Sequence, residues 1–340
     1  MDLTDLGWNS FFESAFLALA RDELVPGRVL VEHKRQYRVW TEAGEIVAEI
    51  SGKMRHGARE PAHYPTVGDW VAVIPRADGG KAVIHCLLPR KSKFSRKAAG
   101  DRTVEQLMAA NVDVIFLMMS LNQDFSVRRL ERYLTMMFES GARPVVLLSK
   151  ADIFPDWARV SKEVEAVARG ATVLAVSAVD GTGIDAIRGC IGRGITVVVL
   201  GSSGVGKSTL INLMAGEELM DTQTIREDDD EGRHTTTHRE LVVLPGGGLL
   251  IDTPGLREFQ LWETTAGLES TFTDLDDLSL TCRFSNCRHE TEPGCAVRAA
   301  IDSGKLELVR LQSYQKLQEE LRSLEKRRQR MSDAPPKRSR

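Results

Sequence analysis

The stretch of this 340-residue chain with the clearest chemistry is GSSGVGKST, residues 201–209. It follows the apolar run ITVVVL and precedes LINLMAG, the order expected for a strand, a glycine-rich turn and a helix. Gly201, Gly206, Lys207 and Ser208 match the pattern G-x-x-x-x-G-K-[ST]. In such a loop, backbone N–H groups and the positive end of the helix face nucleotide phosphates, Lys reaches the β- and γ-phosphates, and Ser ligates Mg²⁺. The predicted nucleotide contacts here are Gly201, Ser202, Ser203, Gly204, Val205, Gly206, Lys207, Ser208 and Thr209.

Two downstream motifs supply the other groups that a nucleoside triphosphatase needs. In LLIDTPG (249–255), Asp252 ends an apolar strand, where it can hold Mg²⁺ through water, and Gly255 offers an N–H to the γ-phosphate. The polar segment GRHTTTHRE (232–240) is the place for a switch threonine that closes on Mg²⁺. Thr237 is favoured, but the sequence does not decide between Thr237 and Thr236. The predicted catalytic residues are Lys207, Asp252, Gly255 and Thr237, and the predicted Mg²⁺ ligands are Ser208 and Thr237 or Thr236.

A base-reading site is predicted upstream of the phosphate loop. PVVLLSKAD places Ser149, Lys150 and Asp152 at the end of a buried strand. An Asp carboxylate accepts hydrogen bonds from guanine N1–H and the 2-amino group, and adenine lacks both donors on that edge. An unpaired buried polar group costs about 1–3 kcal/mol, so this contact separates GTP from ATP. The next strand, TVLAVSAVDGTGI, presents Ser177 and Ala178, where a backbone N–H can meet guanine O6.

The order of these segments is unusual, because the base-reading half precedes the phosphate half. The two base-reading segments keep their own order, and the block as a whole is exchanged with the phosphate loop. A circular permutation has this effect: it joins the old termini, opens new ones in a loop and leaves the packed sheet unchanged.

A cluster of metal-binding residues follows near the C-terminus. Cys282, Cys287, His289 and Cys295 form C-x4-C-x-H-x5-C. Three thiolates and one imidazole make a closed tetrahedral zinc site, which is structural because no coordination position stays open. The alternative is a set of buried reduced cysteines, but the four residues fall within fourteen positions, which favours one bound zinc ion.

The elements that must position these residues can be followed along the chain. Residues 4–21 are predicted to form an amphipathic helix, and five short strands between 26 and 88 suit a small closed barrel such as the OB-fold. Residues 89–102 are interpreted as a basic linker, and a solvated loop or an arm that contacts RNA fits the same composition equally well. Beyond it, apolar strands alternate with helices, which indicates a parallel sheet covered on both faces. The last predicted element is a helix over 304–330 with an apolar stripe.

These patterns predict a division of the chain into five parts. They are an N-terminal helix (1–24), an OB-like barrel (25–92), a permuted α/β nucleotide domain (93–267), a zinc-binding helical domain (268–330) and a basic tail (331–340). The barrel is either a spacer without ligand or an RNA-binding module; basic residues between its strands favour RNA. Those residues are Lys34, Arg35, Lys53, Arg55, His56 and Arg59.

Composition sets the cellular context. Hydrophobic residues make up 42% and charged residues 27%, the balance of a soluble globular protein, and the formal net charge is −3. No run approaches the roughly 20 apolar residues of a membrane span. The acidic N-terminus does not resemble a signal peptide, and five cysteines in this length are not a disulfide framework. We expect a cytoplasmic protein without a membrane partner.

The full series of motifs resembles one family. SKAD, VSA, GSSGVGKST, GRHTTTH and DTPG, preceded by a β domain and followed by the Cys/His cluster, are similar to the ribosome small-subunit-dependent GTPase A family over nearly the whole chain. GRHTTTHRE and CRFSNCRHETEPGCAV are the most specific stretches. The resemblance implies an OB-fold, a circularly permuted P-loop GTPase domain, a zinc domain and a role in late maturation of the 30S subunit. It names the 30S subunit with its 16S rRNA as partner and activator, and we expect a monomer.

Two departures from common GTPase patterns carry predictions. The family's guanine motif usually begins with Asn, and Ser149 stands in its place, so we expect weaker guanine affinity with selectivity resting on Asp152. Leu256 occupies the position where many GTPases carry a catalytic glutamine, so hydrolysis without a partner should be slow. His234 is a possible contributor in the switch, although an exposed histidine without a role is the simpler interpretation.

Two other functions remain to be weighed against the GTPase. One is an RNA-binding scaffold with a vestigial nucleotide site, which the intact Lys207, Ser208 and Asp252 argue against. The other is an ATP-dependent kinase or ATPase, which Asp152 and the lack of an acceptor-site motif disfavour.

Overall fold

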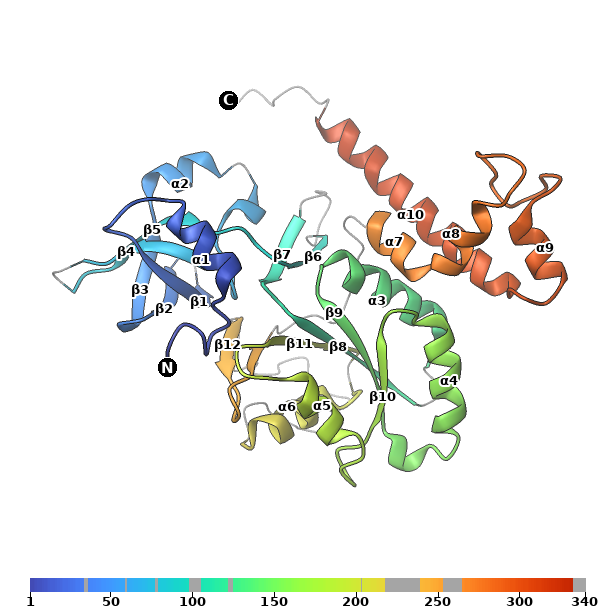
Figure 1. Ribbon diagram of the computed structural model, residues 1–340, viewed down its shortest axis with the longest axis horizontal. Coiled ribbons are helices and arrows are strands. Elements are labelled where there is room, and N and C mark those ends of the chain that lie inside the picture. Colours follow the sequence, from blue (N-terminus) through green and yellow to red (C-terminus); the bar gives the residue numbers. More distant parts are fainter. Residues whose placement is uncertain are drawn as a thin grey trace, which may run out of the picture.

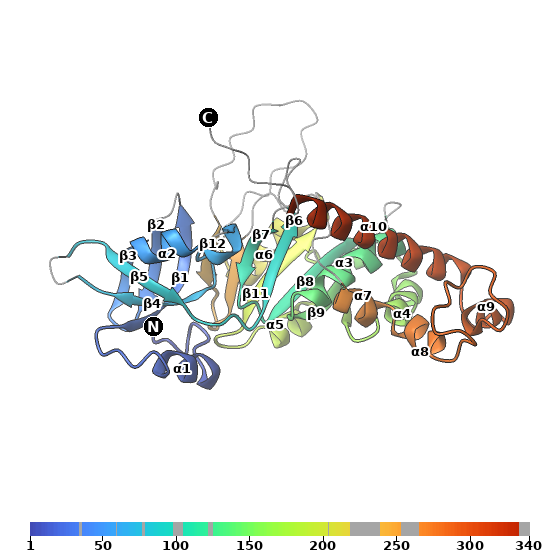
Figure 2. The ribbon, with the colours of Figure 1, turned by 90° about the horizontal axis from the view of Figure 1, so that it is seen from above.

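A computed structural model describes residues 1–33, 36–58, 60–76, 79–97, 105–121, 125–202, 204–217, 239–252 and 265–332. A β-barrel, a central sheet with helices on both faces, and a group of C-terminal helices follow one another along the long axis (Figure 1). The long helix α10 (Leu308–Ser332) runs from the far end of the helical group back along the sheet (Figure 2). None of the helices in these ranges is long and apolar enough to cross a membrane.

The N-terminal helix is shorter than predicted. Helix α1 covers Ser10–Leu17, and its N-cap Asn9 accepts a hydrogen bond from the Phe11 N–H. The preceding residues form turns, with Gly7 in the left-handed region at φ +85°. A helix from residue 4 is therefore wrong, because a left-handed glycine and an N-cap asparagine both lie inside the predicted span.

The predicted barrel is confirmed. Five strands close in the order β1-β2-β3-β5-β4, with β4 returning to β1. All pairs are antiparallel except β3 with β5, which is parallel. The elements of this part are β1 Val25–His33, β2 Gln36–Thr41, β3 Gly44–Ile50, α2 Gly52–Gly57, the 3-10 turn η1 Pro61–His63, β4 Trp70–Ile74 and β5 Ala82–Leu87.

The segment interpreted as a linker contains part of a hairpin. Strand β6 (Lys93–Lys97) pairs antiparallel with β7 (Glu105–Ala110). Phe94 is 1% exposed and belongs to the main core, so one apolar side chain anchors a strand whose other residues are mostly basic. The basic residues in this segment left no visible alternation of apolar and polar residues, so the strand was not predicted. The linker interpretation is wrong for residues 93–97.

The central sheet follows the predicted strand–helix alternation. Its order is β10-β9-β8-β11-β13, and these five strands are parallel. Helices α3 and α4 pack on one face, and α5 and α6 pack on the other, in two separate hydrophobic cores. The elements are β8 Val114–Ser120, α3 Val127–Glu139, β9 Arg143–Ser149, η2 Ala151–Ile153, α4 Trp157–Val167, β10 Thr172–Val176, α5 Ile184–Cys190, β11 Thr196–Gly201, α6 Lys207–Ala215 and β13 Leu249–Asp252.

One strand breaks the all-parallel expectation. Strand β12 (Glu240–Val243) is antiparallel to β13 on one side and to the barrel strand β1 on the other. The connection from β12 to β13 is a short turn, with Gly246 and Gly247 at positive φ, and so short a connection permits only an antiparallel pair. The barrel and the central sheet thereby form one sheet of eleven strands.

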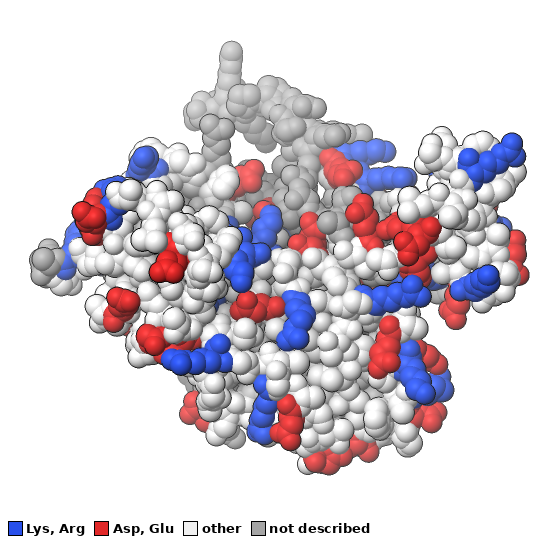
Figure 3. Space-filling model, viewed as in Figure 1, with Lys and Arg blue, Asp and Glu red and all other residues white. Residues whose placement is uncertain are grey.

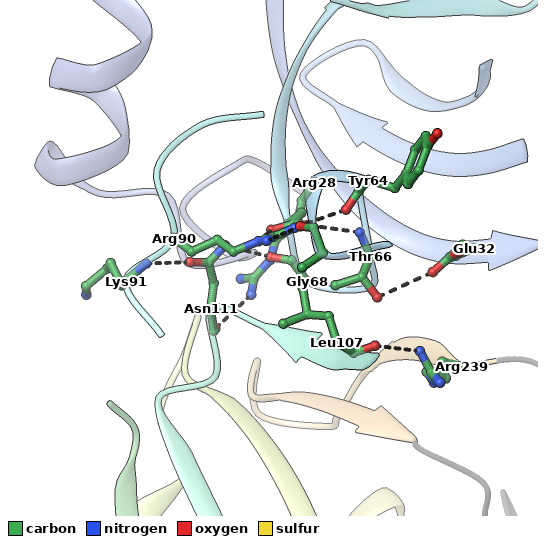
Figure 4. A network of polar contacts seen from close by, with 12 residues as sticks. Arg28, Glu32, Tyr64, Thr66, Gly68, Arg90, Lys91, Leu107, Asn111 and Arg239 are labelled. Atoms are coloured by element: carbon green, nitrogen blue, oxygen red, sulfur yellow. Dashed lines mark hydrogen bonds and ion pairs between the residues drawn. The ribbon is translucent and has the colours of Figure 1, made fainter. Parts of the chain in front are cut away.

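A buried arginine joins the barrel to the central sheet. The Arg28 guanidinium on β1 donates to the carbonyls of Leu6, Gly68 (3.2 Å) and Asn111 (3.1 Å), and to the Thr196 hydroxyl (2.9 Å) at the start of β11. Figure 4 shows part of this network. Burial lowers the pKa of Arg28 to about 10, which still leaves the side chain charged at neutral pH.

The C-terminal helices dock on α3. Arg310 on α10 donates to Glu131 of α3 (2.7 Å), to Asp274 of α8 (2.9 Å) and to the Thr271 carbonyl (2.8 Å). The predicted helix over 304–330 begins later than expected, at Leu308. The elements of this part are α7 Thr265–Thr271, α8 Thr273–Ser279, α9 Ala296–Asp302 and α10.

Candidate nucleotide site and metal centre

The predicted base-reading and phosphate-binding segments meet at one edge of the central sheet. Strand β8 lies between β9 and β11, and its Met118 pairs with Gly201 while its Ser120 pairs with Ser149. Because all three strands are parallel, their carboxyl ends share that edge. The chain leaves β8 toward β9 on one side and later places β11 on the other, so the edge is also a topological switch point, where α/β sheets bind ligands.

The glycines of the phosphate loop are required by its backbone. Gly204 and Gly206 have φ of +74° and +99°, and helix α6 begins directly after Gly206. At Gly201 a Cβ atom would lie 2.5 Å from the Met118 carbonyl oxygen, so only glycine fits. The loop therefore turns sharply from β11 into the amino end of a nine-residue helix, whose first N–H groups face outward.

The Lys207 side chain lies over this loop. Its Nζ donates to the carbonyls of Gly201 (2.8 Å) and Ser202 (2.7 Å). Ser208 is half-buried and Thr209 is exposed. The ammonium group is thus held at the mouth of the loop, where phosphate oxygens would compete for it.

Ser149 connects the base-reading strand to the phosphate loop. Its hydroxyl donates to the Val205 carbonyl at 2.8 Å, and the Met119 carbonyl lies at 3.3 Å. The Ser149 hydroxyl thus braces the phosphate loop through Val205, although serine is shorter than the asparagine that is usual at this position. The expectation of weaker guanine affinity stays a prediction.

The remaining base-reading residues lie in two adjacent turns. Lys150 adopts a left-handed backbone (φ +64°), and Asp152 follows it in η2 with its side chain exposed. On the next strand, the buried Ser177 hydroxyl accepts from the N–H groups of Val179 (3.1 Å) and Asp180 (3.4 Å). This holds the exposed Ala178 in a tight turn beside the end of β10.

Several predicted residues cannot be placed. Ser203, Thr236, Thr237 and Gly255 lie outside the described residues, as do His234 and Leu256. The backbone of Asp252 is described as the last residue of β13, which ends beside β11 at the same sheet edge.

Asp152 carries the prediction of base selectivity. In Asp152→Asn the carboxylate no longer accepts both guanine donors, so we expect the preference for GTP over ATP to fall by about 10- to 100-fold, as for one lost buried hydrogen bond. A nucleotide competition assay measures this. Asp156→Asn, a nearby aspartate without a side-chain cap bond, is the control and should keep the preference. An unchanged preference in Asp152→Asn would refute the assignment.

The four metal-ligating residues converge as predicted. The ligand atoms of Cys282, Cys287, His289 and Cys295 all lie within 4.8 Å of one another. Cys282 Sγ lies 4.0 Å from Cys295 Sγ and 3.7 Å from His289 Nδ1. Zn–S bonds of about 2.3 Å in a tetrahedron place sulfur atoms about 3.8 Å apart, so the cluster fits one zinc ion. Burial lowers the pKa of His289, which favours the neutral imidazole that binds metal.

Glu292 is a supporting residue that the sequence analysis missed. Its carboxylate accepts from the N–H groups of Arg288 (2.8 Å), Glu290 (2.8 Å) and Thr291 (3.1 Å). These backbone donors hold the pKa of Glu292 at about 2. The carboxylate therefore braces the loop between His289 and Cys295; the only sequence signal was an acidic residue before Pro-Gly inside the cluster.

The fold is that of a circularly permuted P-loop GTPase: the phosphate loop follows β11, the predicted base-reading turn follows the earlier strand β9, and the two strands end at one sheet edge. Family comparisons agree: the model described as RsgA GTPase matches residues 87–262, and one described as 50S ribosome-binding GTPase matches residues 196–330. The chain belongs to the RsgA GTPase family.

Individual relatives support this assignment over the whole length. The small ribosomal subunit biogenesis GTPase RsgA of Opitutus terrae is 46% identical over 329 residues, covering 94% of this chain and 90% of that protein. The protein of the same name from Streptomyces coelicolor is 44% identical over 321 residues, covering 94% and 86%. The crystal structure of YjeQ from Thermotoga maritima is 26% identical with a TM-score of 0.64, covering 88% of this chain and 98% of that one.

Proposed function

We propose that this GTPase acts in biogenesis of the small ribosomal subunit. In this proposal the GTP-bound protein binds the maturing 30S subunit through its 16S rRNA in the cytoplasm, acts as a monomer, and leaves after hydrolysis to GDP and phosphate. The observation that carries the proposal is the convergence of the predicted phosphate and base segments at one sheet edge, in a chain that aligns over 94% of its length with proteins named for small-subunit biogenesis. The surface charge of the protein is compatible with RNA binding, because basic and acidic side chains are interspersed over the face in Figure 3.

The proposed roles at the nucleotide follow from position. Lys207 would leave the carbonyls of Gly201 and Ser202 for the β- and γ-phosphates, and Ser208 at the start of α6 would ligate Mg²⁺. Asp252, together with Thr237 or Thr236, would complete the Mg²⁺ shell, and Gly255 would contact the γ-phosphate. With Leu256 unable to orient water, slow turnover alone is the expectation, and the small subunit would order the switch or supply the missing group.

Two further roles concern the base and the zinc. Asp152 would read the guanine edge while Lys150 covers the base. The backbone N–H of Ala178 would meet O6, because the Ser177 N–H donates to the Thr182 carbonyl at 3.0 Å. The Cys₃His cluster would hold one structural zinc ion that shapes the loop from Cys282 to Cys295.

The large ribosomal subunit is a second candidate partner, because one matching family model is described as a 50S ribosome-binding GTPase. The model over 87–262 and the relatives' names favour the small subunit.

Sedimentation with purified subunits separates these possibilities. With a non-hydrolysable GTP analogue, we expect the protein to travel with small subunits and not with large ones. With GDP, we expect it to remain at the top of the gradient. Binding to large subunits alone, or binding that ignores the nucleotide, would disprove the proposal.

A further inference from the structure

The barrel and the central sheet share strand β12. Glu240, its first residue, pairs with Val31 of the barrel strand β1 and with Asp252 at the end of β13. In the sequence Glu240 comes two positions after the GRHTTTH motif (232–238). One residue therefore links the barrel, the motif and the strand that carries the predicted Mg²⁺ carboxylate.

Arg239, the residue before β12, is anchored to the β6–β7 hairpin and lies near the barrel strand β1. Its Nη1 donates to the Leu107 carbonyl of β7 at 2.9 Å. Glu32 of β1 lies near enough to attract the guanidinium, and the Glu32 carboxylate accepts from the Thr66 hydroxyl at 3.4 Å. Figure 4 shows Arg239 directed at the Leu107 carbonyl, with Glu32 and Thr66 above the two residues in that view. Arg96 of β6 is a nearby cation that opposes this attraction.

Burial and the charge of the partner shift the pKa values of Arg239 and Glu32 in opposite directions. Burial lowers the pKa of Arg239 and raises the pKa of Glu32, while each group favours the charged form of the other. Asp69 lies close enough to Glu32 to repel it. Arg239 is thus the cation that this half-buried barrel carboxylate faces, and losing it leaves Glu32 without that compensation.

Glu240 makes a second contact with the barrel. Its carboxylate accepts from Arg38 Nη1 of β2 at 3.0 Å, and Arg38 also donates to Glu45 of β3 at 2.9 Å. Glu240 therefore attaches β12 to the barrel strand β2, while Arg239 attaches the residue before β12 to the β6–β7 hairpin, beside Glu32 of the barrel.

We propose that Arg239 and Glu240 are positioning residues through which the barrel sets the place of β12 and, along the β12–β13 ladder, of Asp252. Contact between the barrel and the small subunit then raises GTP turnover through these two residues. This inference rests on the proposed function. It adds a route for activation that does not require the subunit to touch the nucleotide.

Arg239→Gln tests the inference, with GTP turnover measured alone and with small subunits. We expect turnover without subunits and subunit binding near wild type, and stimulation reduced roughly five- to tenfold, within the usual range of coupling between sites. Arg239→Lys keeps the charge beside Glu32 and a donor for Leu107, so it should recover most of the stimulation.

Glu240→Ala removes the exposed contact with Arg38 and tests the inference independently if Arg239→Gln folds poorly. It should also lose stimulation at unchanged subunit binding. Arg159→Ala is the control, since it breaks an exposed ion pair within α4, away from the barrel, and should behave as wild type.

The outcomes are distinguishable. Full stimulation in both Arg239→Gln and Glu240→Ala would overturn the inference and leave the proposed function intact. Equal loss of stimulated and unstimulated turnover would also overturn it, because the residues would then be merely structural. Absence of stimulation in the wild-type protein would contradict the proposed function, and this inference with it.

Discussion

Lys207→Ala is expected to reduce GTP turnover by roughly 10²- to 10³-fold, the usual cost of removing one charge-stabilising donor from a transition state. Lys207 lies at the mouth of the loop, where its Nζ donates to the carbonyls of Gly201 and Ser202. Phosphate release with saturating GTP and Mg²⁺ measures the loss, with small subunits present to raise the signal.

The control for this variant is Lys162→Ala, which removes an exposed lysine on α4. Both variants should unfold at the wild-type temperature. In Lys207→Ala, water can replace the lysine as hydrogen-bond donor to the carbonyls of Gly201 and Ser202. Turnover that survived in Lys207→Ala would show that the phosphate site is vestigial and would revive the scaffold interpretation.

Cys295→Ser is expected to remove the zinc and unfold the loop around it. The buried Cys295 is a predicted zinc ligand and also the N-cap of α9, accepting from the Arg298 N–H. Serine is a good N-cap, so the substitution keeps the cap and removes the thiolate. Structural zinc contributes up to about 10–16 kcal/mol in small zinc peptides, so the C-terminal helices should melt far below the wild-type temperature.

Elemental analysis and melting with and without a chelator check this expectation. The wild type should carry about one zinc per chain and melt earlier with chelator, while Cys295→Ser should carry none and ignore the chelator. Cys86→Ser, in the barrel strand β5, should keep its zinc. A full complement of zinc in Cys295→Ser would mean that Cys295 is not a ligand.

The nucleotide site was predictable because its signals are local. Glycines at 201, 204 and 206 are demanded by backbone geometry, and the apolar runs before Ser149 and Gly201 identify buried parallel strands. The permuted order then required only that strand ends share one edge, which the register of β8 with its neighbours confirms.

What escaped prediction depends on contacts between distant segments. Arg28 binds mainly backbone carbonyls, which every sequence offers, so nothing around it marks a joint between two domains. The pairing of β12 with the barrel joins segments about 200 residues apart in the sequence. Strand β12 has only four residues, too few for a sequence pattern that would indicate its neighbour in the sheet. The bond from the Ser149 hydroxyl to the Val205 carbonyl also depends on the distance between two strand ends, which residue type alone does not give.

The most direct test of the account is GTP turnover by the wild-type protein with and without purified small ribosomal subunits, with large subunits as the control. The account predicts slow turnover alone and a rise of more than about tenfold with small subunits only, since a group ordered or supplied by a partner can contribute 10³- to 10⁵-fold. The same rate under all three conditions would contradict it.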